Sequence, residues 1–544
     1  MTNQVGNRKK ILKLENKAWI FSSLLLSFFI LVPILIVFSR IFIDKSETFI
    51  YLWKTLLLDY TLNTIYLVFL TSFFSLILGI IPAWVISIYQ FPFRKFYDII
   101  LFLPLAIPTY IMAFTYSDIL SFTGPLQSFL RNNINSIYPL FNNDYLQIEL
   151  LGIFLALSLS PYIYSVSRVS FSMIGSSYLD ISKNLGLSSF KTFWKIILPL
   201  SRPAIFAGLF LVIMEVLNEY GAVKYFGVNT FTTGIFRSWF SFGDINSAIQ
   251  LSSVLILFVL IILILENLSV LKSKFNYKTN SNLNNLISLS NYKSIFANVL
   301  CFFSFLISFL IPLVFIFINS LKSIDKVDLW NLFELTQNSL SISIISALIV
   351  VFLATFFEYC EKLSNNNLSK VINRFISLGY AIPGAVVALG LIIFVTGFND
   401  YLKSKYVIGS FSMMIYALVV RFLAVGKSPV KTSFEKQPES FNETGKIIGF
   451  YPLKLFQKIH LPININALII AFIVCFVDLM KELPITLILR PFNFDTLATQ
   501  TYEFAIEEML MQSSIYSLTI VTICSFMLLV LRNMINFSSN ASRS

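Results

Sequence analysis

The stretch "DISKNLGLSSFKTFWKIILP" at residues 180–199 has a near twin, "ETGKIIGFYPLKLFQKIHLP", at residues 443–462. Each reads as an acidic residue, five residues, a glycine, nine residues and then Ile-x-Leu-Pro. Both are basic and only half apolar, although the chain of 544 residues is 56% hydrophobic and 12% charged. A soluble protein of this size carries about 25% charged residues. These two stretches, called the polar cassettes below, therefore stand out in a chain composed like a membrane protein.

Long apolar windows fill most of the remaining chain. The window 18–39 carries no charge and is long enough to cross ~30 Å of hydrocarbon as a helix. It is too long for a signal-peptide core, so we read it as a retained anchor. Lys405 and Arg421 flank a shorter window and are expected to snorkel to the membrane surface. We expect twelve spanning windows, at 18–39, 61–89, 99–117, 150–167, 203–221, 246–265, 295–320, 337–357, 375–398, 406–420, 463–480 and 512–531.

The net charge of +12 is distributed unevenly between the two sides of the predicted membrane fold. With the N-terminus in the cytoplasm, 28 of the 40 Lys and Arg fall on the cytoplasmic side and 12 on the other. The positive-inside rule then predicts that both termini and both cassettes are cytoplasmic. We interpret the basicity as a topology signal and do not expect nucleic-acid binding.

Cysteine and histidine usage disfavours metal and haem sites. The spacing of the cysteines fits neither a zinc site nor a disulfide framework, so we expect apolar fillers. They are Cys301, Cys360, Cys475 and Cys524. The single histidine, His460, lies in the second cassette and is read as a loop residue. A haem-bearing membrane subunit needs histidines inside its helices, which disfavours that class.

The cassettes belong to a longer internal repeat. Gly186 and Gly449 lie 263 positions apart, and so do Pro199 and Pro462. Further pairs at this offset are Glu215 with Asp478, Glu219 with Glu482, and Thr233 with Thr496. Upstream the offset is 275, and it pairs Asn63 with Asn338 and Pro108 with Pro383.

Two halves of six helices each follow from this repeat. Because six is even, both halves enter the membrane in the same direction, related by a pseudo-two-fold axis along the membrane normal. We expect a first half over residues 1–271 and a second half over residues 295–544. The Asn/Ser/Lys-rich segment 272–294 between them is predicted to be a flexible cytoplasmic linker.

Each cassette is predicted to form two short amphipathic helices at the membrane surface. The glycine between them can turn where a Cβ would clash, or can let another backbone approach closely. Leu-Pro is expected to end the second helix, because proline lacks the N–H group. A simple membrane anchor needs amphipathicity but no fixed residue count. Two copies with the same spacing therefore favour a docking surface for a symmetric partner.

This spacing is similar to the EAA loop of ABC importer permeases, which reads Glu-Ala-Ala, three residues, Gly, nine residues and Ile-x-Leu-Pro. The whole chain resembles the fused permeases of the iron(III) ABC transporter family. The resemblance implies an all-α polytopic membrane protein of about twelve helices, built from two MetI-like halves. It also implies that each loop docks on a separate ATPase. By position, the docking residues are Asp180, Ile181, Ser182, Gly186, Leu187, Pro199, Glu443, Thr444, Gly445, Gly449, Phe450 and Pro462. The alanines of the motif are replaced in both copies.

A nucleotide-binding loop is not found in the sequence. The nearest fragment, "GKS" at 426–428, has Arg421 where such a loop requires glycine. We therefore expect a transport subunit without enzymatic activity of its own. The resemblance implies an ATPase dimer at the cytoplasmic face, a periplasmic or surface binding protein, and residence in a bacterial inner membrane.

The fifth helix of each half carries two acids spaced by four residues, which predicts that each pair shares a helical face. They are Glu215 and Glu219, then Asp478 and Glu482. From a helix start near Arg202, Glu215 lies roughly 20 Å along the helix. A charge at the bilayer centre costs ~2.5–3.5 kcal/mol, so such residues usually face a pore or a partner. Either they line a translocation pathway, or they pack the halves together with Lys481 as a neutralising neighbour.

The outer segments at 225–240 and 489–505 also look like those of iron(III) permeases, which favours ferric iron as the cargo. Hard ferric iron prefers oxygen ligands such as carboxylates. We expect no permanently bound cofactor, and the metal-coordinating residues stay unknown. Three alternatives remain open: the same machinery with thiamine or another small solute, a proton-coupled secondary transporter, and a membrane scaffold without transport.

Overall fold

The structure, a computed structural model, describes residues 2–42, 45–133, 145–184, 186–271, 286–364, 366–402 and 409–541. Helices account for almost all of it, and the predicted all-helical membrane fold is confirmed. The first half contains α1 (Thr2–Ser39), η1 (Arg40–Phe42), α2 (Glu47–Thr55), α3 (Leu57–Ile88), β1 (Tyr89–Gln90), α4 (Arg94–Ile100), η2 (Leu103–Ala106), α5 (Thr109–Leu120), α6 (Pro125–Asn133), α8 (Ile148–Asn184), α9 (Ser189–Thr192), η3 (Phe193–Ile197), α10 (Leu198–Asn218), α11 (Gly221–Tyr225), α12 (Phe231–Phe236), η4 (Arg237–Ser241) and α13 (Ile245–Leu271).

The second half repeats this order. It contains β2 (Ile287–Ser288), α14 (Asn291–Phe305), η5 (Leu306–Leu310), α15 (Ile311–Ser323), η6 (Ile324–Lys326), α16 (Leu329–Ser364), α17 (Asn367–Ile376), η7 (Ser377–Ala381), α18 (Gly384–Leu402), α19 (Phe411–Glu435), α20 (Ser440–Ile448), α21 (Pro452–Leu455), η8 (Phe456–His460), α22 (Leu461–Met480), α23 (Pro484–Leu489), α24 (Leu497–Ile506) and α25 (Leu510–Ala541).

Within the described residues, eleven helical stretches are long and apolar enough to cross a membrane, or twelve if one bent pair counts as a span. The bent pair replaces the straight helix expected at 99–117. Its two parts, Arg94–Ala106 and Thr109–Asn133, meet at 92°. The break lies before Pro108, because a residue that precedes proline is driven to extended backbone. The second half breaks at Pro383 in the same way, between η7 and α18.

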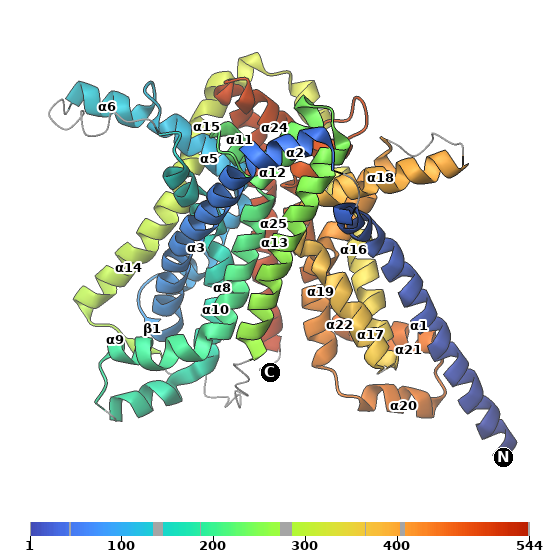
Figure 1. Cartoon of the computed structure of the whole chain (residues 1–544). Coiled ribbons are helices and arrows are strands. Elements are labelled where there is room, and N and C mark those ends of the chain that lie inside the picture. The colour runs from blue at the N-terminus through green and yellow to red at the C-terminus, as the bar shows by residue number, and fades with distance from the viewer. Residues whose placement is uncertain are drawn as a thin grey trace.

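The two halves exchange their first helices. Helix α1 packs against α16, α17 and α18 of the second half. Helix α14 packs against α3 and α4 of the first half, and its continuation α15 lies between α5 of the first half and α25 of its own half. Figure 1 shows α1 along the outside of the second half and α14 along the outside of the first. Each sequence repeat is therefore completed in space by a helix from the other one.

Figure 1 also shows that both chain ends lie with α9 and α20 at one end of the molecule, opposite α2, α11, α12 and α24. The termini and the cassettes thus share one end, called the cassette end below. That this end is cytoplasmic stays a prediction. Of the predicted linker, residues 272–285 lie outside the described residues. Residues 286–294 are structured, because β2 pairs in parallel with β1 and α14 begins at Asn291.

Candidate functional site

Each cassette turns at its glycine. Gly186 has φ +70° and Gly449 has φ +88°, the left-handed conformation that favours glycine. The amide of Leu187 donates to the carbonyl of Ser182 at 2.9 Å, and the equivalent bond in the second cassette ends on Gly445. This six-to-one bond is the Schellman ending of a helix. A Cβ on either turn glycine would meet no atom within 4 Å. The predicted turn is confirmed, and no backbone of this chain's described residues approaches either glycine.

The expectation that Leu-Pro ends the second cassette helix is wrong. The π-helical turns η3 and η8 run directly into α10 and α22, and Pro199 and Pro462 lie in the first turns of those helices. The amide of Leu198 bonds to the carbonyl of Phe193, five residues back. A π-turn is wider by one residue, which gives the proline ring room that a regular turn lacks. Each cassette is consequently continuous with a spanning helix.

The two cassettes are packed differently at the positions where the EAA motif has alanine. In the first cassette, the buried hydroxyl of Thr192 donates a hydrogen bond to the buried hydroxyl of Ser182 at 3.0 Å. In the second cassette these positions are Gly445 and Leu455, and a Cβ on Gly445 would lie 2.2 Å from the Leu455 Cδ1. Small residues are therefore required here by packing. Asp180 and Ile181 lie on α8, but their side chains fall outside the described part, whereas Glu443 and Thr444 are exposed on α20.

The reading of His460 as a loop residue is wrong. It lies in η8 and is completely buried. Its Nδ1 is 2.8 Å from Gln437 Oε1, and its Nε2 is 2.8 Å from Asn442 Oδ1. Lys362 of α16 donates to the Gln437 carbonyl at 2.7 Å. A polar cluster thus fastens the second cassette to α16, whereas the first half has apolar residues at the three corresponding positions, Ile174, Leu179 and Ile197.

Exposed apolar side chains cover both cassettes. They are Phe190, Trp194, Ile447, Ile448, Tyr451 and Leu453. Large exposed apolar groups mark contact sites for another protein or for the membrane. Docking of a partner on the cassettes stays a prediction.

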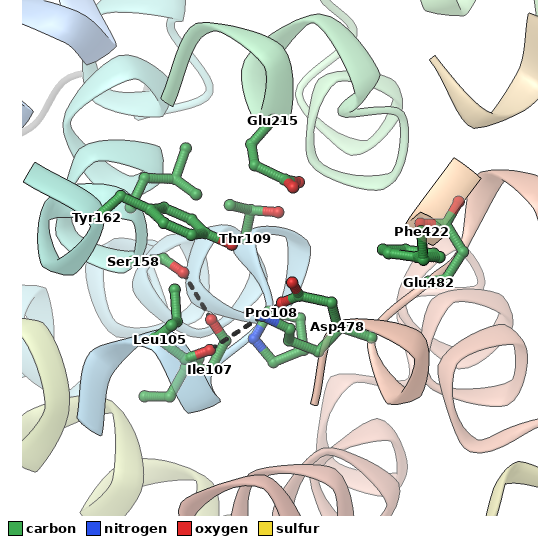
Figure 2. A pocket seen from close by; sticks show the side chains of 12 residues that line it. Leu105, Ile107, Pro108, Thr109, Ser158, Tyr162, Glu215, Phe422, Asp478 and Glu482 are labelled. Atoms are coloured by element: carbon green, nitrogen blue, oxygen red, sulfur yellow. Dashed lines mark hydrogen bonds and ion pairs between the residues drawn. The ribbon is translucent and has the colours of Figure 1, made fainter. Parts of the chain in front are cut away.

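The four acids of the fifth helices lie at the C-terminal ends of those helices. Glu215 is in the last turn of α10, and Glu219 directly follows its last residue. Asp478 is in the last turn of α22, but Lys481 follows its last residue and Glu482 comes one position later. The expected shared helical face is wrong, because both helices end between the two acids. Glu215 and Asp478 nevertheless point into one cavity of about 50 Å³, as Figure 2 shows. The break before Pro108 forms one of its walls.

In the first half, the acids have neutral hydrogen-bond partners. Glu215 accepts from the hydroxyl of Tyr380, which belongs to the other half. Glu219 accepts from the Thr109 hydroxyl and, at 2.9 Å, from the amide of Ala222. These bonds hold both carboxylates in place without neutralising their charge.

In the second half, both acids have charged partners. Lys481 Nζ is 2.9 Å from Asp478 Oδ1, and Arg421 Nε is 3.4 Å from Glu482 Oε2. Arg421 is only 2% exposed, so the expectation that it snorkels to the surface is wrong. It lies inside α19, which begins at Phe411 and continues to Glu435. Lys405, the other expected snorkel, lies outside the described residues.

The same cluster joins the two halves. Asn218 Oδ1 accepts from Arg421 Nη1 at 2.6 Å and from the amide of Gly384 at 2.7 Å. In return, Lys481 donates to the carbonyl of Leu105 at 3.2 Å. The fifth helix of each half thus contacts the broken third helix of the other. The packing role that the sequence left open is present, and Lys481 neutralises Asp478 as that interpretation proposed.

A cavity of about 590 Å³ reaches the cluster from the cassette end. Its lining includes Tyr162 and Asp478, which also line the central cavity, and Lys431 and Glu435 toward the cassettes. Figure 1 shows the halves spreading apart in this direction. At the opposite end the halves are in contact, and the ring centroid of Tyr220 in the first lies 5.7 Å from that of Tyr502 in the second. A separate cavity of about 350 Å³ lies beside these two tyrosines, but none of the four acids lines it. The acids are therefore reached by the cavity at the cassette end and not by this one, and the end where the halves meet is called the closed end below.

Comparison with known proteins finds similarity to transport permeases. Residues 75–272, from α3 to the end of α13, match the family described as "Binding-protein-dependent transport system inner membrane component". The chain is 26% identical over 471 residues to an Fe(3+)-transport system permease protein of Haemophilus influenzae, covering 84% of this chain and 86% of that protein. It is 28% identical over 169 residues to the sulfate transport system permease protein of Salmonella typhimurium, covering 30% of this chain and 57% of that one.

The segments after the fifth helices confirm one pairing of the predicted repeat and correct another. The side-chain amide of Asn63 donates to the Asn229 carbonyl at 3.0 Å, and that of Asn338 donates to the Asp495 carbonyl at 3.2 Å. The pairing of Asn63 with Asn338 is thus confirmed. The pairing of Thr233 with Thr496 is wrong, because Thr496 caps α24 as Thr230 caps α12.

Residues 426–428 lie inside α19, not in a loop. Lys427 is buried, with Nζ 3.5 Å from Glu358 Oε1 and 3.0 Å from the Ser377 hydroxyl. The four cysteines are free and buried, as predicted for apolar fillers.

Proposed function

We propose that this chain is the membrane-spanning subunit of an ABC importer that moves ferric iron into the cytoplasm. A binding protein delivers the iron at the closed end, and a separate ATPase dimer binds the cassettes. The subunit lies in a bacterial inner membrane with both termini cytoplasmic, surrounded by lipid and without a permanent cofactor. The similarity to the Fe(3+) permease along 84% of the chain supports this cargo.

The observation that carries the proposal is the continuous helix that links each cassette to the acids. The helical span Ser189–Asn218 begins with the second helix of the first cassette and ends beside Glu219, and Pro452–Met480 begins with the second helix of the other cassette and ends two positions before Glu482. A helix rises 1.5 Å per residue and resists bending, so movement of one end is transmitted to the other. An ATPase that draws the two cassettes together therefore moves the carboxylates at the far ends.

The charge of the central cluster supports a cation. The cluster contains four carboxyl groups, on Glu215, Glu219, Asp478 and Glu482, and two basic groups, on Arg421 and Lys481. Carboxylate oxygens are ligands that hard cations such as ferric iron prefer. Other relatives are sulfate permeases, but sulfate is an anion, which carboxylates repel. Thiamine remains the alternative cargo for the same machinery.

The transport cycle is alternating access. The structure, open toward the cassettes, corresponds to the inward-facing state. Closure of the ATPase dimer on ATP brings the cassettes together, separates the halves at the opposite end and exposes the acids to the binding protein. Hydrolysis restores the inward-facing state and releases iron to the cytoplasm.

Reconstitution tests the proposal. Proteoliposomes containing this chain, its ATPase and its binding protein are supplied with labelled ferric iron, labelled thiamine or labelled sulfate. We expect iron uptake only when ATP is present on the side of the membrane where the ATPase is bound. Omitting the binding protein should abolish the uptake. Uptake driven by a proton gradient without ATP contradicts the ABC mechanism, and selective uptake of thiamine or sulfate contradicts the cargo.

A further inference from the structure

The central cavity and the cavity at the cassette end, called the cassette-end cavity below, lie back to back. Tyr162 and Asp478 line both of them, and Asp478 is the only one of the four acids that lines the cassette-end cavity. The central cavity, at about 50 Å³, has room for only a few water molecules, against about 590 Å³ on the other side. A solute that passes from the acids to the cassette end must therefore cross the wall between these two cavities.

A hydrogen bond between the two halves crosses this wall. The hydroxyl of Tyr380, in the second half, donates to Oε1 of Glu215, in the first. Glu215 lines the central cavity and not the cassette-end cavity, whereas Tyr380 lines the cassette-end cavity and not the central one. Figure 2 shows Glu215 and Tyr162 side by side at the central cavity, opposite Asp478. The donor thus lies on one side of the wall and the acceptor on the other.

The two partners of this bond are carried by different parts of the molecule. Glu215 lies in the last turn of α10, which continues the first cassette. Tyr380 lies in η7, which packs closely on α19, because a Cβ on Gly379 would lie 2.5 Å from the Val420 carbonyl oxygen. The 3₁₀ turn of η7 leads directly into the break before Pro383, and a 3₁₀ stretch between helices often marks a hinge. Movement of the first cassette relative to α19 therefore acts on this bond.

The internal repeat does not duplicate the link across the wall. At the offset of 275, Tyr380 corresponds to Leu105, whose side chain has no hydroxyl. The link on that side runs from Asp478 through Lys481 to the Leu105 carbonyl. Leu105 and Lys481 both line the central cavity and not the cassette-end cavity, so this second link stays on one side of the wall. The hydrogen bond to Glu215 is consequently more than a repeated packing contact.

We propose that Tyr380 is the inner gate of the pathway and that its hydrogen bond to Glu215 holds the gate shut. The bond must break before a solute can leave the central cavity for the cassette end. Tyr162, whose side chain lines both cavities, forms the other edge of the gate. The gate acts by closing space, so it restrains any small solute whatever its charge. The inference rests on the proposed function for the direction of transport, which places this gate on the cytoplasmic side.

Site-specific thiol labelling of the full-length chain in lipid nanodiscs tests the gate. Ser158 lines the central cavity and Ser428 the cassette-end cavity, and neither lines both. Ser158→Cys therefore reports on the space behind the gate, and Ser428→Cys on the space in front of it. The probe is methyl methanethiosulfonate, a small neutral thiol reagent. Peptide mass spectrometry measures the labelling rate at each introduced cysteine separately from the four native ones.

Two tyrosine substitutions separate a gate from a packing contact. Tyr380→Phe removes only the hydroxyl that reaches Glu215. The matched control is Tyr416→Phe, because the Tyr416 hydroxyl donates to the Phe29 carbonyl of α1 and so also joins α19 to a helix from the other half of the sequence. Tyr416 lines neither the central cavity nor the cassette-end cavity. Both variants lose one hydrogen bond between the halves, but only Tyr380→Phe loses it at the wall.

We expect Tyr380→Phe to speed the labelling of Ser158→Cys about tenfold. This factor corresponds to 1.4 kcal/mol, near the lower end of what a hydrogen bond to a charged group contributes. Tyr416→Phe should change this rate by less than about threefold, and so should either variant at Ser428→Cys. An unchanged rate at Ser158→Cys in Tyr380→Phe, or an equal increase in Tyr416→Phe, overturns the proposal.

A second variant covers the case in which Tyr380→Phe does not assemble. Tyr162→Val removes the other edge of the gate and introduces the residue that the second half has at the equivalent position, Val425. It should also speed the labelling of Ser158→Cys, and an unchanged rate in this variant overturns the proposal.

The labelling test uses neither cargo nor ATPase, so it separates this inference from the proposed function. If Tyr380→Phe exposes Ser158→Cys but the wild-type chain imports no iron, the gate stands and the cargo is wrong. If iron is imported and Tyr380→Phe leaves the labelling of Ser158→Cys unchanged, the cargo stands and the gate is wrong.

Discussion

Valine in place of Gly186 and Gly449 is expected to release the ATPase from the permease while leaving the protein in the membrane. Both glycines have positive φ, and a side chain at either position would meet no neighbour within 4 Å. The substitution therefore acts through backbone strain alone. It disturbs the angle between the two helices of each cassette, which sets where the exposed apolar residues lie, and it leaves the spanning helices untouched.

The magnitude follows from the cost of the left-handed conformation. An L-residue there costs roughly 1–2 kcal/mol, and a β-branched residue lies at or above the upper end. If each cassette must keep its turn to bind, each substitution weakens ATPase binding by about tenfold, since 1.4 kcal/mol corresponds to a factor of ten. The double variant should bind about 100-fold more weakly.

The assay is co-purification and equilibrium binding of the ATPase to the permease in nanodiscs. Asparagine at the same two positions is the matched control, because asparagine tolerates the left-handed region. We expect the asparagine variant to bind within a few-fold of wild type. Unchanged binding by the valine variant, or equal loss in both variants, contradicts the role of the turn in docking.

The other predictions concern the second cassette, the buried ion pair and the open cavity. Gly445→Ser alone should lower the Tm and the ATPase affinity, because the new Cβ overlaps the Leu455 side chain at a cost of about 1–3 kcal/mol. Adding Leu455→Thr copies the first cassette and should restore both quantities. Failure to restore them contradicts the packing argument. Glu482→Gln leaves Arg421 buried beside a neutral partner and should cost about 3–5 kcal/mol, measured as a lower Tm in detergent. Arg421→Ser together with Glu482→Gln should cost less, and an equal or larger loss argues against the ion pair. Ser428 lines the cavity at the cassette end, so the variant Ser428→Cys should react with a membrane-impermeant maleimide added from the cytoplasmic side. The reaction should be blocked when the ATPase is held closed. The four native cysteines are buried and should give little background labelling. Reaction from the outer side would reverse the orientation proposed for the chain.

Local patterns in the sequence were sufficient for the elements that depend on neighbouring residues. The apolar windows predicted the spans, because a helix in lipid must satisfy its own backbone within one segment. Gly186 and Gly449 predicted the cassette turns, because positive φ is a property of single residues. The matched offset predicted equivalent contacts for Asn63 and Asn338, and the structure contains them.

Where local signals competed, the predictions failed. Pro199 by itself predicts the end of a helix, but a π-turn makes room for its ring and the helix continues. The break before Pro108 could have been found, since the same Ile-Pro pair recurs before Pro383. The polar cassette predicts a loop position for His460, because the sequence does not show that Gln437 and Asn442 form hydrogen bonds with its ring in the interior.

Only the tertiary structure decided the chemistry of the centre. The sequence identified the four acids but not that the helices end between them, nor that Glu215 meets Tyr380 and Glu482 meets Arg421. Arg421 and Asn218 are 203 positions apart, and Tyr380 and Glu215 are 165 apart. Periodicity and spacing report what a residue does to its neighbours in the chain. Which carboxylate acquires a counter-ion depends on how two separately built halves pack against each other, and no local pattern carries that information.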